Sequence, residues 1–155
     1  MQLKYPLNCY DEAGRMKPPL FVYILLLFVC RGLLVLIVSL SFTQDSERLL
    51  RIFYPFPSHF YLSLIPLAPA LLALYLLSKR TILWQKEHHG WFKSLPFSLY
   101  CALILDGGIQ IFILKETHFF FSLTHGVSLL FIACGLVYMK KSGYMRNLVE
   151  DWTRP

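Results

Sequence analysis

Long apolar runs separated by short polar segments organise the whole chain. Four runs of roughly 20 residues stand out by their content of Leu, Ile, Val and Phe, and each is long enough to cross a bilayer as an α-helix. They cover about 20–43, 60–78, 95–114 and 119–139. Lipid offers no partner to unpaired backbone groups, and the runs lack the alternation of barrel strands. We therefore predict an all-α, polytopic membrane protein built as a four-transmembrane-helix bundle.

The composition supports this class over a soluble domain. The chain has 155 residues, of which 56% are hydrophobic and 15% are charged, and the charged share lies well below the quarter typical of soluble domains. We expect residues 1–155 to form a single integral membrane domain. The first run is too long for a secretory signal peptide, and no small-x-small cleavage site follows it at 39–46, so we interpret it as a retained span.

The distribution of Lys and Arg predicts the orientation. The N-terminal segment 1–19, the loop 79–94 and the tail 140–155 together carry 11 of the 15 Lys and Arg residues, whereas the connections on the other side carry 3. Because cytoplasmic segments are enriched in these residues, we predict that both termini are cytoplasmic. The net charge of +6 is then mainly an orientation signal. It favours contact with anionic lipid headgroups over nucleic-acid binding.

Two residues of opposite charge interrupt the first and third runs at the same depth. Arg31 lies eleven residues from Leu20, and Asp106 lies eleven residues from Leu95, so each is about 16 Å from the cytoplasmic edge. An Arg at mid-span costs about 2.5–3.5 kcal/mol on the insertion scale, and a carboxylate at matching depth is its cheapest neutraliser. We predict an Arg31–Asp106 ion pair, within one chain or across a dimer interface. Three glycines near the pair would allow close helix packing: Gly32, Gly107 and Gly108.

Further polar residues extend this pair into a candidate polar track. Gln110 is four residues past Asp106, hence on the same helical face one turn outward. His125 lies in the fourth run at a similar depth. Two interpretations of Arg31, Asp106, Gln110 and His125 stay open at this point. The track either fixes the register of the helices, or it is a proton or substrate path in which Asp106 or His125 titrates.

Two prolines predict a kink in the second run. Pro66 and Pro69 each remove a backbone donor, which frees the carbonyls of Leu62 and Ile65. Such gaps survive in membranes only where protein or water meets the freed groups. We expect a kinked packing helix, with a broken-helix substrate site as the alternative.

The chain shows no arrangement typical of an enzyme or a metal centre. The four cysteines form no CxxC motif, and the adjacent pair His88–His89 has no third ligand spaced nearby. We find no nucleophile–base constellation and no nucleotide-binding motif. We therefore expect no cofactor, no metal and no catalytic residue.

Two predictions concern the ends of the spans. In the tail, Tyr144, Leu148 and Trp152 recur at four-residue spacing, which predicts a short amphipathic helix that lies on the membrane or docks on a partner. In the first outer loop, we expect His59 to face water together with Arg48 and Arg51.

The N-terminal region resembles a known family. Tyr10–Asp11, Gly14 and Lys17–Pro18–Pro19, followed by Arg31 in the first span, are similar to the opening of the YfeZ-like family of bacterial inner-membrane proteins of unknown function. The resemblance implies a short four-span chain in a Gram-negative inner membrane. It supplies no activity and no catalytic residue.

Two functional hypotheses follow. The first is a non-enzymatic integral inner-membrane protein that assists or scaffolds a membrane assembly, with a second copy or another membrane protein as its partner. The second is a small proton-coupled transporter that uses the polar track and the Pro-broken second span. A membrane enzyme is the weakest alternative.

Overall fold

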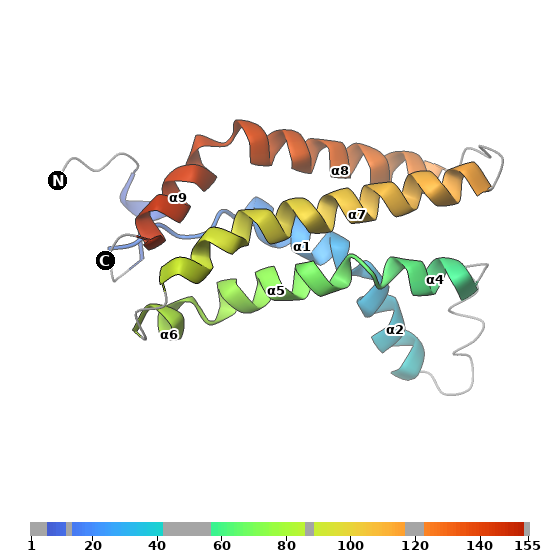
Figure 1. Ribbon diagram of the computed structural model, residues 1–155, viewed down its shortest axis with the longest axis horizontal. Coiled ribbons are helices and arrows are strands. Elements are labelled where there is room, and N and C mark those ends of the chain that lie inside the picture. Colours follow the sequence, from blue (N-terminus) through green and yellow to red (C-terminus); the bar gives the residue numbers. More distant parts are fainter. Residues whose placement is uncertain (1–5, 12–13, 42–56, 86–88, 117–122, 154–155) are drawn as a thin grey trace.

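A computed structural model describes residues 6–11, 14–41, 57–85, 89–116 and 123–153 (Figure 1). Within these ranges the chain is helical, and its only β-type pairing is an isolated bridge between Tyr10 and Met16. The elements, in chain order, are η1 (Leu7–Cys9), α1 (Leu20–Val29), α2 (Arg31–Ser41), α4 (Pro57–Ser63), α5 (Leu67–Ser78), α6 (Arg80–Gln85), η2 (His89–Lys93), α7 (Ser94–Glu116), α8 (Leu123–Lys141) and α9 (Gly143–Thr153).

Helix α7 is the centre of the bundle. It has 23 residues and runs between α5 and α8, with α1 also packed against it (Figure 1). Its buried positions recur every three or four residues from Leu95 to Ile113, so one broad face meets the neighbouring helices. The opposite face keeps large apolar side chains exposed, including Phe97 and Ile104. The helix extends the predicted third run, 95–114, by one or two residues at each end.

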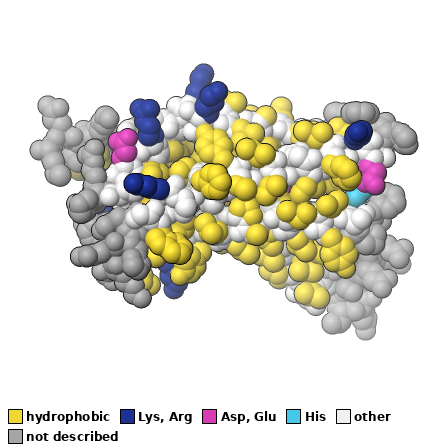
Figure 2. Space-filling view, in the orientation of Figure 1, with side chains coloured by type: hydrophobic (Ala, Val, Ile, Leu, Met, Phe, Trp, Pro, Cys, Tyr) yellow, Lys and Arg dark blue, Asp and Glu magenta, His cyan; other side chains and the backbone are white. Residues whose placement is uncertain are grey.

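The exposed surface fits a lipid environment. Figure 2 shows apolar side chains across the middle of the molecule, while charged side chains lie toward its ends and along its upper edge. Leu20 and Phe97 are each 75% exposed, which water would penalise and lipid does not. Two stretches among the described residues are long and apolar enough to span a membrane, Ser58–Ser78 and Gly90–Glu116, and a third is added if α1 and α2 count as one broken span. The all-helical membrane class is confirmed, and the count of four spans stays a prediction.

The first run is broken, contrary to the single helix that we predicted over 20–43. Helix α1 ends before Cys30, and α2 continues at an angle of 58° to it. Arg31 Nη1 donates a hydrogen bond to the backbone carbonyl of Phe28 at 3.1 Å. In a straight helix that carbonyl would accept from the N–H of Gly32. A side chain inserted into the backbone ladder is a recognised cause of a sharp kink, and α2 diverges from the bundle here (Figure 1).

A turn interrupts the second run at its prolines. Residues 64–66 form a turn between α4 and α5. There the N–H of Ile65 donates to the carbonyl of Leu62 at 3.1 Å, and the N–H of Ala68 donates to the carbonyl of Ile65 at 3.4 Å. Both carbonyls that the prolines free are therefore partnered by tighter i→i+3 bonds. This arrangement favours a local kink over an open substrate site.

Glycine allows the closest helix approach, although at a position that we did not single out. A Cβ on Gly135 of α8 would lie 2.7 Å from Leu25 Cδ2 of α1, and one on Gly107 would lie 3.4 Å from Ile132 Cγ2. A Cβ on Gly108 would meet nothing within 4 Å. A glycine inside a predicted span, away from any turn, was the available signal for Gly135.

Candidate functional site

Arg31 and Asp106 form a bidentate ion pair within one chain. Arg31 is the first residue of α2, and Asp106 lies in the middle of α7. The Nη2–Oδ1 distance is 2.8 Å and the Nη1–Oδ2 distance is 2.9 Å. The Asp106 side chain is 2% exposed and the Arg31 side chain 29%. Parallel N–H···O bonds of this kind add geometric specificity to the charge attraction.

Neighbouring groups hold both partners in place. The guanidinium lies over the ring of Phe28, 4.5 Å from its centroid, and also bonds to the Phe28 carbonyl. Gln110 Nε2 donates to Asp106 Oδ2 at a longer distance of 3.4 Å. The contacts of Arg31 therefore join α1, α2 and α7 at one point. Because each charge has an opposite charge and a further polar contact, the pair is neutralised internally.

The predicted polar track reaches Gln110 and goes no further in the described structure. Gln110 is 4% exposed, and its Oε1 is buried with no hydrogen-bond partner among the described residues. His125 lies on α8 and is half-buried. No hydrogen bond or ion pair between described residues connects it to Gln110. The arrangement thus joins three of the four predicted residues and leaves His125 apart.

The ion pair can hold the helices in a fixed arrangement. An ionised pair with all carboxylate oxygens engaged offers neither a free nucleophile nor a free base. The part of the chain that the structure describes contains no group of three or more His, Cys, Asp or Glu side chains that could hold a metal. Among the described residues, Gln110 Oε1 is a buried side-chain atom without a hydrogen-bond partner, and it could accept a hydrogen bond from a water molecule or a small donor.

A second polar contact lies at the α4 end of the bundle. His59 Nε2 is 3.2 Å from Glu116 Oε2, which places the start of α4 against the last turn of α7. His59 is 7% exposed, so the expectation that it faces water is wrong. The packing of α4 on α7 covers the ring, and Glu116 replaces its water partner. Arg48 and Arg51 lie outside the described residues.

The N-terminal segment and α9 are joined by three hydrogen bonds, which we call the terminal clasp. Asp151 Oδ2 accepts from the backbone N–H of Met16 at 2.9 Å, and Trp152 Nε1 donates to the Met16 carbonyl at 3.0 Å. The Tyr144 hydroxyl donates to the carbonyl of Lys17 at 2.7 Å. Residues 127 to 136 positions apart in the sequence are thereby held together. Residues 16–17 and α9 therefore lie together at one end of the bundle (Figure 1).

The clasp corrects the interpretation of the tail. We predicted that the apolar stripe of the tail lies on the membrane or docks on a partner, but Leu148 is 0% and Trp152 2% exposed. The Trp152 ring meets Phe92 of η2 edge-on, with centroids 5.3 Å apart. Burial, with the Cys9 thiol nearby, raises the pKa of Tyr144 to about 12, which favours the neutral hydroxyl that donates to Lys17. The tail therefore packs on its own chain.

Fold and site together define an all-helical membrane protein whose broken first run is tied to its central helix by an ion pair. Residues 5–151 match the family described as "Protein of unknown function (DUF2919)", and the chain belongs to this family. It is similar to "Inner membrane protein YfeZ" of Escherichia coli (strain K12), with 35% identity over 71 residues. That match covers 46% of this chain and 48% of the relative, about half the length of each. No solved structure matches. The resemblance seen in the N-terminal residues is confirmed.

Proposed function

We propose that this chain is a non-enzymatic integral inner-membrane protein that serves as an accessory or scaffolding component of a membrane assembly. Its similarity to a relative named as an inner membrane protein supports the location. We further propose four spans with both termini cytoplasmic. Helix α8 supports the count, since its 19 residues extend over about 28 Å beside α7. The bias of Lys and Arg supports the orientation.

The observation that carries the proposal is the closed Arg31–Asp106 pair. A proton-coupled carrier needs an acidic group that gains and loses its proton during the cycle. Here both oxygens of Asp106 accept short bonds from Arg31, and the carboxylate is 2% exposed. The freed carbonyls at the proline bend are partnered as well. These features favour a fixed arrangement of helices over a moving one.

The diverging helix α2 is the surface to which we assign the partner. The ion pair holds its first residue on α7, while the 58° bend directs the rest away from the bundle. Ile37 and Leu40 are 52% and 68% exposed on this helix. An apolar helix held away from its own bundle offers a packing surface to another transmembrane helix. The partner is thus a transmembrane helix of a second copy or of another membrane protein.

Site-specific photo-crosslinking in the native membrane tests this assignment. A photoreactive amino acid at position 37 should give a discrete protein adduct, whereas position 111 on α7, which carries the comparably exposed Ile111, should react with lipid alone. The adduct should disappear in an Arg31→Leu background, because α2 then loses its direction. Only lipid adducts from both positions would contradict the assignment. A reporter fused to the C-terminus that is active only in the periplasm would contradict the orientation.

A proton-coupled carrier is the second candidate, and Gln110 is the observation that favours it. Its unpartnered Oε1 lies beside a buried carboxylate, where a water molecule could pass a proton. The double variant Arg31→Leu/Asp106→Leu separates the two functions. For a scaffold, the double variant should fold but lose its crosslink, because it also lacks the guanidinium that directs α2, and neither the wild-type protein nor the variant should show a proton flux. For a carrier, it should fold but abolish a proton flux that the wild-type protein shows in proteoliposomes under an imposed pH gradient.

A further inference from the structure

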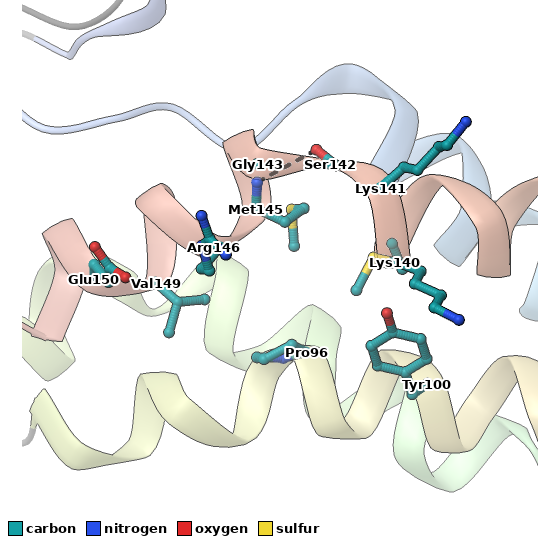
Figure 3. A pocket seen from close by; sticks show the side chains of 11 residues that line it. Pro96, Tyr100, Lys140, Lys141, Ser142, Gly143, Met145, Arg146, Val149 and Glu150 are labelled. Atoms are coloured by element: carbon teal, nitrogen blue, oxygen red, sulfur yellow. Dashed lines mark hydrogen bonds between the residues drawn. The ribbon is translucent and has the colours of Figure 1, made fainter.

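A cavity with cationic walls lies at the α9 end of the bundle, apart from the ion pair. It has a volume of about 410 Å³ and separates the first turns of α7 from the junction of α8 and α9 (Figure 3). This volume falls within the range of small-molecule sites. Its lining combines basic side chains of α8 and α9, among them Lys140 and Arg146, with Pro96 and Tyr100 of α7.

The charges of the cavity select an anion. Lys140, Lys141 and Arg146 contribute three positive charges, and Glu150 contributes the one negative charge in the lining. In Figure 3, Lys140 extends toward Tyr100 and Arg146 lies between α9 and Pro96, whereas Lys141 points away from α7. Lys140 and Tyr100 therefore lie on one side of the cavity and Arg146 on the other, so that the two cations flank the space between the helices. Ammonium, guanidinium and hydroxyl groups are the donors that bind phosphate oxygens in proteins.

The turn between α8 and α9 strengthens this preference. Helix α9 begins at Gly143, with the Ser142 hydroxyl accepting from the N–H of Met145 at 3.4 Å (Figure 3). A Cβ on Gly143 would meet nothing within 4 Å, so the first turn of α9 is open to a ligand. The partial positive charge of a helix N-terminus adds to that of the side chains.

The floor of the cavity is apolar, which indicates an amphiphilic ligand. Met139 and Met145 are 6% and 3% exposed, and Pro96 and Val149 complete this surface. The cavity also lies at the ends of α7 and α8, where lipid headgroups meet the protein if these helices cross the membrane. Basic pockets between helices at this depth are typical sites for anionic headgroups.

We propose that this cavity binds the phosphate group of an anionic ligand, through Lys140, Arg146 and Tyr100. The phosphate belongs either to a phospholipid headgroup or to free phosphate. The inference rests on the proposed placement of α7 and α8 across the membrane and not on the scaffolding role. A C-terminal reporter tests that placement separately, so the two failures are distinguishable.

Ligand binding by the full-length protein in mild detergent tests the proposal. The probes are phosphatidylglycerol, phosphatidylcholine and inorganic phosphate at matched ionic strength, and the readouts are native mass spectrometry and the shift in melting temperature. The variant Lys140→Gln/Arg146→Gln should weaken phosphatidylglycerol binding about 25-fold, because each cation contributes about fivefold. The matched control Lys79→Gln/Lys93→Gln removes the same charge outside the cavity and should change binding less than twofold. Tyr100→Phe, which keeps the fold, should weaken binding several-fold.

The three probes distinguish a phospholipid headgroup from free phosphate as the source of the bound phosphate group. Binding of phosphatidylglycerol but not of inorganic phosphate supports a lipid headgroup, and equal binding of inorganic phosphate supports a soluble ligand. Equal loss of affinity in the cavity variant and the control would overturn the site, since charge alone would then explain binding. The site would also be overturned if the cavity variant still bound phosphatidylglycerol and inorganic phosphate, or if the folded wild-type protein bound neither.

Discussion

Replacing Arg31 with Leu removes one member of a buried pair and leaves the other behind. The Asp106 carboxylate, which is 2% exposed, would then keep one hydrogen-bond donor among the described residues. That donor is Gln110 Nε2, at 3.4 Å. The Leu side chain itself suits the surroundings of α1 and α2, so the expected loss comes from the stranded carboxylate. The break at Cys30 should also relax, because the Phe28 carbonyl loses the guanidinium that occupies it.

The magnitude follows from the burial. Removing one partner of a buried ion pair costs about 3–5 kcal/mol. Gln110 remains as a donor to the carboxylate, so we expect a value near the lower end, about 3 kcal/mol. That is roughly a 150-fold change in the folding equilibrium. The double variant Arg31→Leu/Asp106→Leu should lie within about 1 kcal/mol of wild type, because no charge is then left buried.

Denaturant titration in detergent micelles, followed by helical circular dichroism, measures these free energies of unfolding. Arg80→Leu provides a comparison, since its partner Asp11 is half-buried, with 31% of its side chain exposed against 2% for Asp106. This control should cost about 1 kcal/mol or less. If the Arg31→Leu variant were as stable and as abundant as the wild-type protein, the reasoning would be refuted, because the ion pair would then contribute nothing to the stability of the fold.

The remaining predictions concern packing and the terminal clasp. Gly135→Ala should destabilise the protein by about 1–3 kcal/mol, because its Cβ would lie 2.7 Å from Leu25 Cδ2. Gly108→Ala should be neutral or stabilising, since its Cβ would meet nothing within 4 Å. Thermal unfolding compares the two variants. Trp152→Phe should cost about 1–2 kcal/mol by leaving a buried carbonyl unpaired, with faster proteolysis of the N-terminal segment as the readout. Tyr144 should ionise near pH 12, which near-ultraviolet absorbance measures by comparison with the Tyr144→Phe variant. Its contribution to the stability of the fold is complete below about pH 10 and is lost as the pH rises to about 12. Ionisation at the ordinary pH would argue against its burial.

The sequence indicated the pairing of Arg31 and Asp106 because both lie at the same depth in runs that enter from the same side. It could not reveal the break at Cys30. That break follows from competition for the Phe28 carbonyl, which depends on the direction of the guanidinium toward α7. Likewise, the spacing of Leu148 and Trp152 predicts an apolar stripe on α9 whether a membrane, a partner or the chain itself covers it.

The sequence alone therefore determined the class of protein, the apolar runs and the depth of its two opposite charges, since hydrocarbon thickness and insertion energy depend on composition and length. Only the tertiary structure decided what each helix contacts. It directed α2 away from the bundle, folded α9 onto the N-terminal segment, buried His59 beside Glu116 and left His125 unconnected to Gln110. Such choices depend on side-chain directions and on competition between acceptors, and residues far apart in the chain settle them together.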